Sequence, residues 1–222
     1  MTDHITPTQF RGSDGVADWR VINDGACAFF GTRSIAESAK LVHAIGAIAE
    51  IDAHRPLIDV RPRGVTVCLL TRESDYYGMS QRDVEFARQI SAAARGLGLG
   101  ADPSAVQGFL VIPGAPKIAE VMPFWRAILG YEPRADSPKE DLVDPRDRAP
   151  GFWFEQMKVP RGDGGGAIHV CVWVPYEQAE ARIAAALAEG GHMVRDEFAP
   201  SWWTLADAAG NECDIGTTQG RD

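Results

Sequence analysis

The sequence predicts an α+β protein of two domains, and three observations support this prediction. Residues 18–96 read in the order hairpin, helix, strand, helix, which is typical of an antiparallel sheet covered on one face. Residues 100–104 then combine turn-forming types and read as a linker. After it, a β-α-β order occurs twice at similar spacing, which indicates a duplicated unit. We therefore expect a loose N-terminus at 1–15, a first domain at 16–100, a linker at 101–105 and a second domain at 106–218.

Length, composition and charge limit the classes of function. The chain has 222 residues, of which 45% are hydrophobic and 24% charged, as in soluble globular proteins. Its net charge of −9 argues against a nucleic-acid partner, since phosphate binding needs a concentrated basic surface. No apolar run approaches the roughly 20 residues that span a bilayer, and the N-terminus does not read as a signal peptide. We expect a cytoplasmic protein with no membrane partner.

The elements of the first domain follow from local patterns. Strand-like residues 18–22 and 26–30 flank Asn23-Asp24-Gly25, a strong signal for a tight turn. Ser34 predicts the start of a helix whose apolar residues recur at helical spacing up to Ala49.

A strand and a second helix complete this domain. Residues 63–71 read as the strand. Ser80 and Asp83 form a start like a capping box, and the helix should end near Gly96-Leu97-Gly98.

The second domain reads as strands and helices in two similar series. We predict strands at 106–112, 152–157 and 168–174 and around 202–205 and 212–215, with helices at 122–129 and 177–187. Gly162–Gly166 lacks the strand-to-helix context of a phosphate loop and reads as a flexible turn.

The four cysteines have no short pairing, and each lies in apolar, strand-like surroundings. They are Cys27, Cys68, Cys171 and Cys213. Buried free thiols are the expected state, with metal or redox roles as the alternative.

A motif at the end of the first predicted helical region connects the first domain to a family. Ala53-His54-Arg55-Pro56 precedes a strand that ends in Thr71-Arg72, and Gly78-Met79-Ser80-x-x-Asp83 opens the next helix. This resembles pterin-4a-carbinolamine dehydratase, whose pattern is His-His-Pro, a strand ending in Thr-His, and Gly-Leu-Thr-x-x-Asp. The resemblance covers roughly residues 15–100. His54 stands where the first histidine belongs, and Arg55 and Arg72 replace the other two.

The resemblance implies proton transfer as water leaves a carbinolamine. The departing hydroxyl needs an acid and the ring nitrogen needs a base, and histidine suits both roles. Arginine stays protonated and offers no base, so Arg55 and Arg72 are candidates for binding an anionic or carbonyl-rich ligand. His54 and Asp83 are the catalytic candidates. The alternatives are binding without turnover, an altered reaction, or a domain for assembly with His54 bonded to backbone and both arginines paired with surface acids.

Three motifs connect the second domain to another family. They are Phe124-Trp125-Arg126-x-x-Leu129-Gly130-Tyr131, Ile168-His169-Val170 and Ala206-Asp207-Ala208-Ala209-Gly210-Asn211-Glu212. Together they resemble the glyoxalase-like family of the vicinal-oxygen-chelate superfamily over about residues 105–217. The fold implied is a pair of βαβββ modules that form one cupped sheet around a pocket.

That superfamily places metal ligands on the first and last strands of each module. The corresponding residues here are Gln107 or Gly108, Glu155, His169 and Asp214. One imidazole and two carboxylates suit a divalent metal that acts as a Lewis acid, so Glu155, His169 and Asp214 are the metal candidates. The alternative is a hydrogen-bonded histidine with both carboxylates facing solvent.

Five tryptophans fall on or beside the predicted cup. They are Trp125, Trp153, Trp173, Trp202 and Trp203, and they indicate an aromatic-lined cleft for a small ligand, with ordinary core packing as the alternative.

Three hypotheses for function follow. The first is a small-molecule enzyme of lyase or isomerase type, with 4a-hydroxytetrahydrobiopterin dehydratase as the nearest named activity. The second is a non-catalytic protein whose aromatic cup binds a small planar or hydrophobic compound, with the first domain as an oligomerisation platform. The third is metal-dependent catalysis in the second domain alone. The expected partner is a small molecule, pterin-like or aromatic. Both families imply a homo-oligomer.

Overall fold

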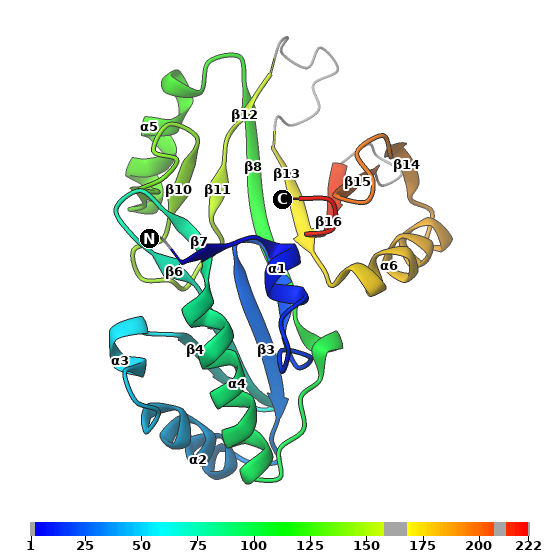
Figure 1. The fold of residues 1–222 in the computed structure, drawn as a ribbon. Coiled ribbons are helices and arrows are strands. Elements are labelled where there is room, and N and C mark those ends of the chain that lie inside the picture. The colour runs from blue at the N-terminus through cyan, green and yellow to red at the C-terminus, as the bar shows by residue number, and fades with distance from the viewer. Residues whose placement is uncertain (1–2, 158–167, 207–211, 222) are drawn as a thin grey trace. The chain divides into compact units, whose positions relative to one another are not determined.

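The computed structural model describes residues 3–157, 168–206 and 212–221, and the chain divides into two compact units (Figure 1). The first unit comprises Met1–Val106 and Thr218–Asp222, and the second comprises Gln107–Thr217. Both combine helices with mostly antiparallel sheets, so the predicted α+β class is confirmed. The predicted turn at Gly162–Gly166 and Asp207–Asn211 of the third motif lie outside the described residues.

The main sheet of the first unit has four antiparallel strands in the order β2-β3-β5-β4. Their bounds are β2 (Arg20–Ile22), β3 (Gly25–Gly31), β4 (Leu57–Arg61) and β5 (Gly64–Leu69). Asn23 adopts a φ of 55° in the predicted turn between β2 and β3, a conformation that asparagine tolerates better than most residues. The sequence analysis found the hairpin and β5 but not β4.

Two helices, α2 (Ile35–Gly46) and α4 (Gln81–Gly96), bury their apolar faces against this sheet. The shared core contains Ala28, Phe30, Leu41, Ile45, Val65, Val67, Val84 and Ile90, all at most 1% exposed. Both predicted helix starts are present. Ser34 accepts a hydrogen bond from the Glu37 N–H, and Ser80 and Asp83 form a capping box.

A single helical turn, α3 (Ile51–His54), connects α2 to β4. Glu50 and Arg55 flank it, with φ values of 63° and 53°. These left-handed residues reverse the chain at both ends of the turn, so His54 is the last residue of α3.

The predicted loose N-terminus is wrong for the part of it that the structure describes. His4–Ile5 forms β1, which pairs with β7 (Tyr77–Ser80), and β7 pairs with β6 (Thr71–Arg72). Pro7–Arg11 forms α1 with a complete capping box between Thr6 and Gln9, and Phe10 is only 1% exposed. The buried phenyl ring and the satisfied cap hold this segment in place.

The segment predicted as a linker belongs to the first unit. Ala101 forms a bridge with Phe30, and the Asp102 N–H donates to the Phe29 carbonyl at 2.9 Å. A short 3-10 helix, η1 (Pro103–Ala105), follows.

The prediction of free thiols is wrong for Cys27 and Cys68, which form a disulfide. The two residues are direct partners on β3 and β5, and their Cα atoms lie 4.1 Å apart. A pairing across 41 residues leaves no local pattern in the sequence. Cys171 is a buried thiol and Cys213 a half-buried one.

The second unit contains two modules that share one sheet of order β14-β15-β16-β13-β8-β11-β10-β9, with β12 also paired to β8. In each module the first strand runs parallel to a late one, β8 to β11 and β13 to β16, and β8 and β13 join the modules as antiparallel neighbours. The bounds are β8 (Gly108–Ala115), α5 (Ile118–Leu129), β9 (Glu132–Pro133), β10 (Asp141–Val143), β11 (Phe152–Trp153), β12 (Glu155–Gln156), β13 (Ile168–Trp173), α6 (Tyr176–Ala188), β14 (His192–Arg195), β15 (Trp202–Ala206) and β16 (Glu212–Gly216).

Helices α5 and α6 cover the same face of this sheet. Val111 packs in the cluster that includes α5, and Val172 packs in the cluster that includes α6. The register pairs Val170 with Val111, so Val111, Val170 and Val172 share a face. We call the opposite face the open face; it carries Ile112 and His169. No helix among the described residues has the length and apolarity to cross a bilayer.

Candidate functional site

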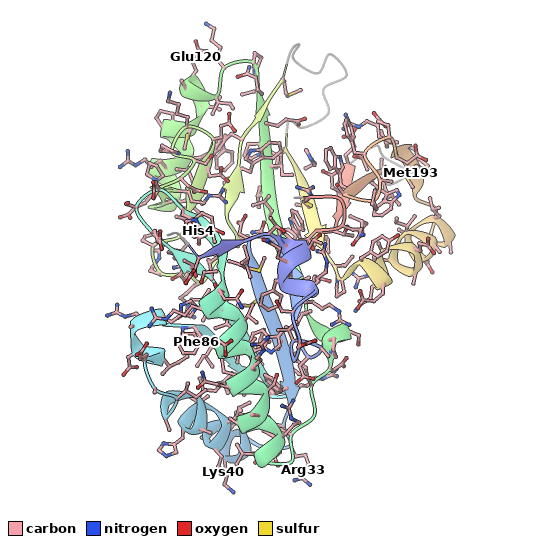
Figure 2. The ribbon with its side chains drawn as sticks, in the orientation of Figure 1. His4, Arg33, Lys40, Phe86, Glu120 and Met193 are labelled. Carbon is pink, nitrogen blue, oxygen red and sulfur yellow. A yellow bond between two sulfur atoms is a disulfide. The ribbon has the colours of Figure 1, made fainter. Side chains whose placement is uncertain are left out.

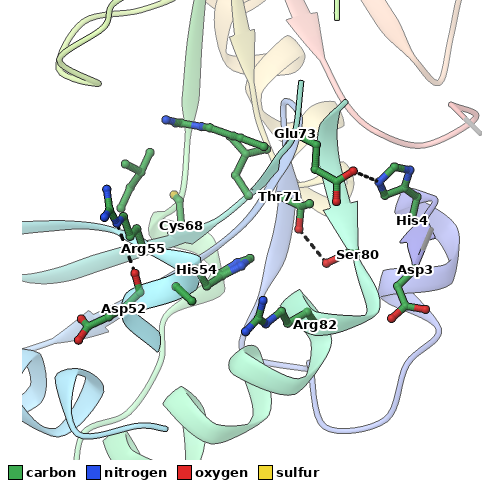
Figure 3. A pocket seen from close by; sticks show the side chains of 14 residues that line it. Asp3, His4, Asp52, His54, Arg55, Cys68, Thr71, Glu73, Ser80 and Arg82 are labelled. Atoms are coloured by element: carbon green, nitrogen blue, oxygen red, sulfur yellow. Dashed lines mark hydrogen bonds and ion pairs between the residues drawn. The ribbon is translucent and has the colours of Figure 1, made fainter. Parts of the chain in front are cut away.

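A pocket of about 790 Å³ in the first unit contains the site predicted from the sequence (Figure 3). His54, Arg55 and Arg72 all line it, although they come from α3, the residue after it, and β6. These residues come together because β4 and β5 are paired neighbours in the sheet. Helix α3 leads into β4, and β6 follows β5 along the chain.

The imidazole of His54 is held by a buried carboxylate. Its Nε2 lies 2.6 Å from Oδ1 of Asp83, and the two side chains are 6% and 0% exposed. The ring of Phe86, which projects from α4 (Figure 2), lies 4.9 Å from the imidazole centroid. Among the described residues, His54 makes no hydrogen bond through Nδ1. The alternative in which His54 bonds to backbone is therefore not what the structure shows, since its partner is a carboxylate.

The second oxygen of Asp83 is also satisfied. Oδ2 accepts from the Ser80 N–H at 2.7 Å, from the Ser80 hydroxyl at 3.0 Å and from the Thr71 hydroxyl at 2.7 Å. Burial is the largest single influence on the pKa of Asp83 and raises it, but the bonds from His54, Thr71 and Ser80 together lower this pKa below its ordinary value. Asp83 is therefore ionised at neutral pH and can only accept hydrogen bonds.

An ionised Asp83 fixes the proton on His54. Because the carboxylate has no proton to give, Nε2 of His54 carries the hydrogen of this bond, and Nδ1 is left to accept or donate a proton. Asp83 is not among the residues that line the pocket, whereas His54 is. The structure thus separates the two predicted catalytic residues: His54 can contact a ligand, and Asp83 positions His54.

The two arginines present cations to the same space. Arg55 donates from Nε to the Asp52 carbonyl at 3.3 Å, and the guanidinium carbon of Arg72 lies 5.2 Å from the ring centroid of Tyr77. Both are largely exposed side chains on the pocket wall. A guanidinium there can donate to anionic or carbonyl oxygens.

Sequence reasoning missed several lining residues, among them His4, Glu73 and Arg82. Arg82 follows the capping serine of α4 and pairs with Glu50 at 2.9 Å. His4 reaches the pocket because β1 pairs with β7. The sequence Thr6-Pro7-Thr8-Gln9 has the form of a capping box with proline at the first helical position, a signal of an ordered N-terminus that our expectation of a loose one overlooked.

In the second unit the structure brings two of the three predicted metal ligands together. His169 Nε2 lies 3.2 Å from Oδ2 of Asp214, whose Oδ1 accepts from the Thr204 hydroxyl at 2.7 Å. Thr204 is fully buried and the other two side chains are 11% exposed. This arrangement is a hydrogen-bonded chain on the open face.

Glu155 does not join that chain. It lies on the same face, opposite Gly114 of β8, and is half-buried. Among the described residues, no group of three or more His, Cys, Asp or Glu side chains is placed to hold a metal ion. The predicted set of Glu155, His169 and Asp214 therefore does not fit a metal centre in this arrangement.

The five tryptophans divide between the two faces of the sheet. Trp125 packs on Phe152 with ring centroids 5.4 Å apart, in the core under α5, and Trp203 packs in the core under α6. These two do not line the open face. Trp153, Trp173 and Trp202 lie on it by strand alternation, and Trp153 is 38% exposed.

The fold and the site define the class of this protein. It is a two-unit α+β protein with a carboxylate-held imidazole at a polar pocket in its first unit and paired βαβββ modules in its second. Residues 6–93 match the family model described as pterin 4 alpha carbinolamine dehydratase, and residues 110–216 match the glyoxalase-like domain. A putative pterin-4-alpha-carbinolamine dehydratase of Nocardia farcinica (strain IFM 10152) is 35% identical over 78 residues, which are 35% of this chain and 80% of that protein. The chain belongs to the pterin-4a-carbinolamine dehydratase family through its first unit, and its second unit is a glyoxalase-like domain.

Two solved structures share weak similarity with this chain. An NAD-dependent benzaldehyde dehydrogenase structure from Legionella pneumophila has 12% identity and a TM-score of 0.37, with 49% of this chain and 97% of that one covered. A glyoxalase/bleomycin resistance protein/dioxygenase superfamily member from Vibrio splendidus 12B01 has 14% identity and a TM-score of 0.34, with 50% and 99% covered.

Proposed function

We propose that the first unit is a lyase that dehydrates a carbinolamine on a small, pterin-like ring, with His54 as the proton-transfer residue. The observation that carries the proposal is the contact of 2.6 Å between His54 and the buried Asp83, at the wall of a pocket large enough for such a ring. The family membership supports the same chemistry.

The roles of the residues follow from their protonation. Asp83 holds the Nε2–H of His54 and stabilises the imidazolium that forms when Nδ1 takes a proton. Arg55 and Arg72 stay cationic and orient carbonyl or anionic groups of the ligand. Neither arginine can serve as the base. Of the histidines in the family pattern, only the first, His54, is therefore available for proton transfer here.

The test is turnover of a pterin 4a-carbinolamine by the full chain. His54→Ala should lower kcat by a factor of about 100 or more, as expected for loss of a general acid–base group. His43→Gln is the matched control, because His43 is exposed on α2 and does not line the pocket. Equal activity of wild type and His54→Ala would refute the assignment, and no turnover by wild type would refute the proposed reaction.

A second candidate function is ligand binding by the second unit, favoured by Trp153 and Trp202 on the open face; Trp173 lies on the same face but is only 6% exposed. Trp202 also stacks on Phe198, with ring centroids 4.3 Å apart and planes 12° apart, which gives a flat aromatic surface. Trp202→Ala should weaken binding of a planar aromatic probe followed by fluorescence. Trp203→Ala, on the helix face, should lower stability instead, and equal effects of both on binding would contradict this assignment. The homo-oligomer and the cytoplasmic location stay predictions.

A further inference from the structure

A second imidazole, that of His4, lines the same pocket as His54. Its Nε2 lies 3.3 Å from Oε2 of Glu73, and its ring stacks flat on Tyr76 with centroids 3.4 Å apart and planes 7° apart. The side chain of His4 is 25% exposed and that of Glu73 is 50% exposed. Figure 3 shows the contact between the two side chains as a dashed line. His4 is thus held on one face and at one nitrogen while remaining accessible from the pocket.

The support beneath His4 is built into the hairpin of β6 and β7. The Glu73 N–H donates to the Tyr76 carbonyl at 2.8 Å, and this bond closes the turn that carries both partners of His4. The Tyr76 hydroxyl donates to the Met79 carbonyl at 2.6 Å, so the ring lies back along β7 over Gly78. A Cβ at position 78 would lie 2.6 Å from the Tyr76 hydroxyl oxygen, so only glycine leaves room for this ring.

The two imidazoles are connected through Ser80 and Asp83. His4 is the direct partner of Ser80 in the β1–β7 pairing, and Ser80 donates both its N–H and its hydroxyl to Asp83, which holds His54. A further backbone bond, from the Gln81 N–H to the Asp3 carbonyl at 2.8 Å, anchors the same segment at the start of α4. The position of His4 relative to His54 is therefore set by paired backbone rather than by a loop.

From this arrangement we infer that His4 is the second proton-transfer residue of the site and replaces, from a different part of the chain, the histidine function lost at Arg55 and Arg72. The inference rests on the proposed carbinolamine dehydration. The ligand would lie between two carboxylate-paired imidazoles, His4–Glu73 and His54–Asp83.

The dehydration is balanced with two such groups. One imidazolium donates a proton to the carbinolamine hydroxyl, the C–O bond breaks, and water leaves. The neutral imidazole takes the proton of the adjacent ring N–H, and the nitrogen electron pair forms the C=N bond. No oxidant or reductant is consumed, and proton exchange with water restores both imidazoles. The other ionisable groups at this part of the pocket are Asp3, Glu73, Arg72, Arg82 and Tyr76.

The first test compares His4→Gln with His43→Gln in turnover of a pterin 4a-carbinolamine. His4→Gln should lower kcat by a factor of about 100 and remove one limb of the pH profile of kcat/KM, whereas His43→Gln should change neither. Glu73→Gln, which keeps the shape of the partner, should give a smaller loss. An activity of His4→Gln within twofold of wild type, beside an inactive His54→Ala, would overturn the role of His4 and leave the proposed function standing.

A second measurement is independent of turnover. Imidazole NMR signals of the full chain should show that 7,8-dihydropterin shifts both His4 and His54 and leaves His43 unchanged. A shift of His54 alone would overturn the inference even if His4→Gln failed to fold. Absence of both turnover and dihydropterin binding in wild type would overturn the proposed function together with the inference.

Discussion

Ser80 donates to Asp83 through both its backbone N–H and its hydroxyl, at 2.7 and 3.0 Å. The two residues form the capping box that begins α4, and Asp83 also holds His54. A single carboxylate therefore caps the start of a helix and orients the candidate catalytic imidazole. The hydrogen bonds of Asp83 thus stabilise the start of α4 and also fix the geometry of the site.

Replacement of this carboxylate should lower stability and change its pH dependence. Asp83→Asn leaves the buried donors of Ser80, Thr71 and His54 with a poorer acceptor, so the free energy of unfolding at pH 7 should fall by about 2–4 kcal/mol. The pKa of Asp83 in the folded state is lowered, so its contribution is complete above the unfolded pKa of about 3.9 and is lost as pH falls through the folded pKa.

Urea unfolding at pH 7 and below pH 4 measures both effects. Asp83→Asn should show a flatter loss of stability in acid than wild type. Asp59→Asn is the control, because Asp59 forms an exposed surface pair with Arg61 and its loss should change stability by less than about 1 kcal/mol. Equal effects of the two substitutions would contradict the assigned role of Asp83.

The Cys27–Cys68 disulfide should contribute substantially to the stability of the first unit. It closes a loop across a sequence separation of 41 residues, for which the chain-entropy argument gives about 4 kcal/mol. The double variant Cys27→Ser, Cys68→Ser should therefore unfold at lower urea, and dithiothreitol should destabilise wild type but not this variant. Alkylation and mass spectrometry should modify only Cys171 and Cys213 of the unreduced, unfolded chain. Modification of all four would show that the disulfide is not formed.

At Arg55, the backbone conformation should determine stability and the guanidinium should determine ligand binding. Its φ of 53° is strained for a side chain with a Cβ and natural for glycine. Arg55→Gly should therefore be more stable than Arg55→Ala by about 1 kcal/mol, while both variants bind dihydropterin equally weakly. Urea unfolding and calorimetric titration measure the two properties. Equal stability of the variants would contradict the strain argument, and unchanged binding would remove Arg55 from the site.

In the second unit, the three predicted metal ligands should respond differently to substitution. Asp214→Asn weakens the bonds from the buried Thr204 and from His169. The free energy of opening that protects the amides of β15 and β16 from hydrogen exchange should therefore fall by about 1–3 kcal/mol. Glu155→Gln lies outside that hydrogen-bonded chain and should change the same opening free energy by less than about 0.5 kcal/mol. About one equivalent of a divalent metal by elemental analysis, lost in both variants and in His169→Ala, would contradict the hydrogen-bonded arrangement.

Local patterns predicted the elements whose causes are local. Ser34 and the Ser80–Asp83 pair are helix caps that can be recognised from residue type and spacing alone. Asn23-Asp24-Gly25 can likewise be recognised as the turn of a hairpin. The edge strand β4 was not predicted because Leu57–Arg61 follows a proline and carries charged residues at its third and fifth positions. Only its pairing with β5 makes this segment a strand.

The parts that sequence did not predict depend on contacts between distant segments. Cys27 meets Cys68 because β3 pairs with β5, and His4 meets Glu73 because β1 pairs with β7; the two contacts join residues 41 and 69 positions apart. Trp202 and Trp203 are neighbours in sequence, yet strand alternation places one on the open face and the other in the core. A shift of one residue in register would exchange them, and no composition argument fixes register.

The sheet of the second unit has its two modules joined through β8 and β13, which are interior strands, while β9 and β14 form its ends. Either module expressed by itself would present the backbone of its longest strand, unpaired, to any other chain. Such a fragment should aggregate or associate into a substitute pair rather than remain a monomer. The two modules therefore repeat one topology, but each depends on the other to pair its longest strand.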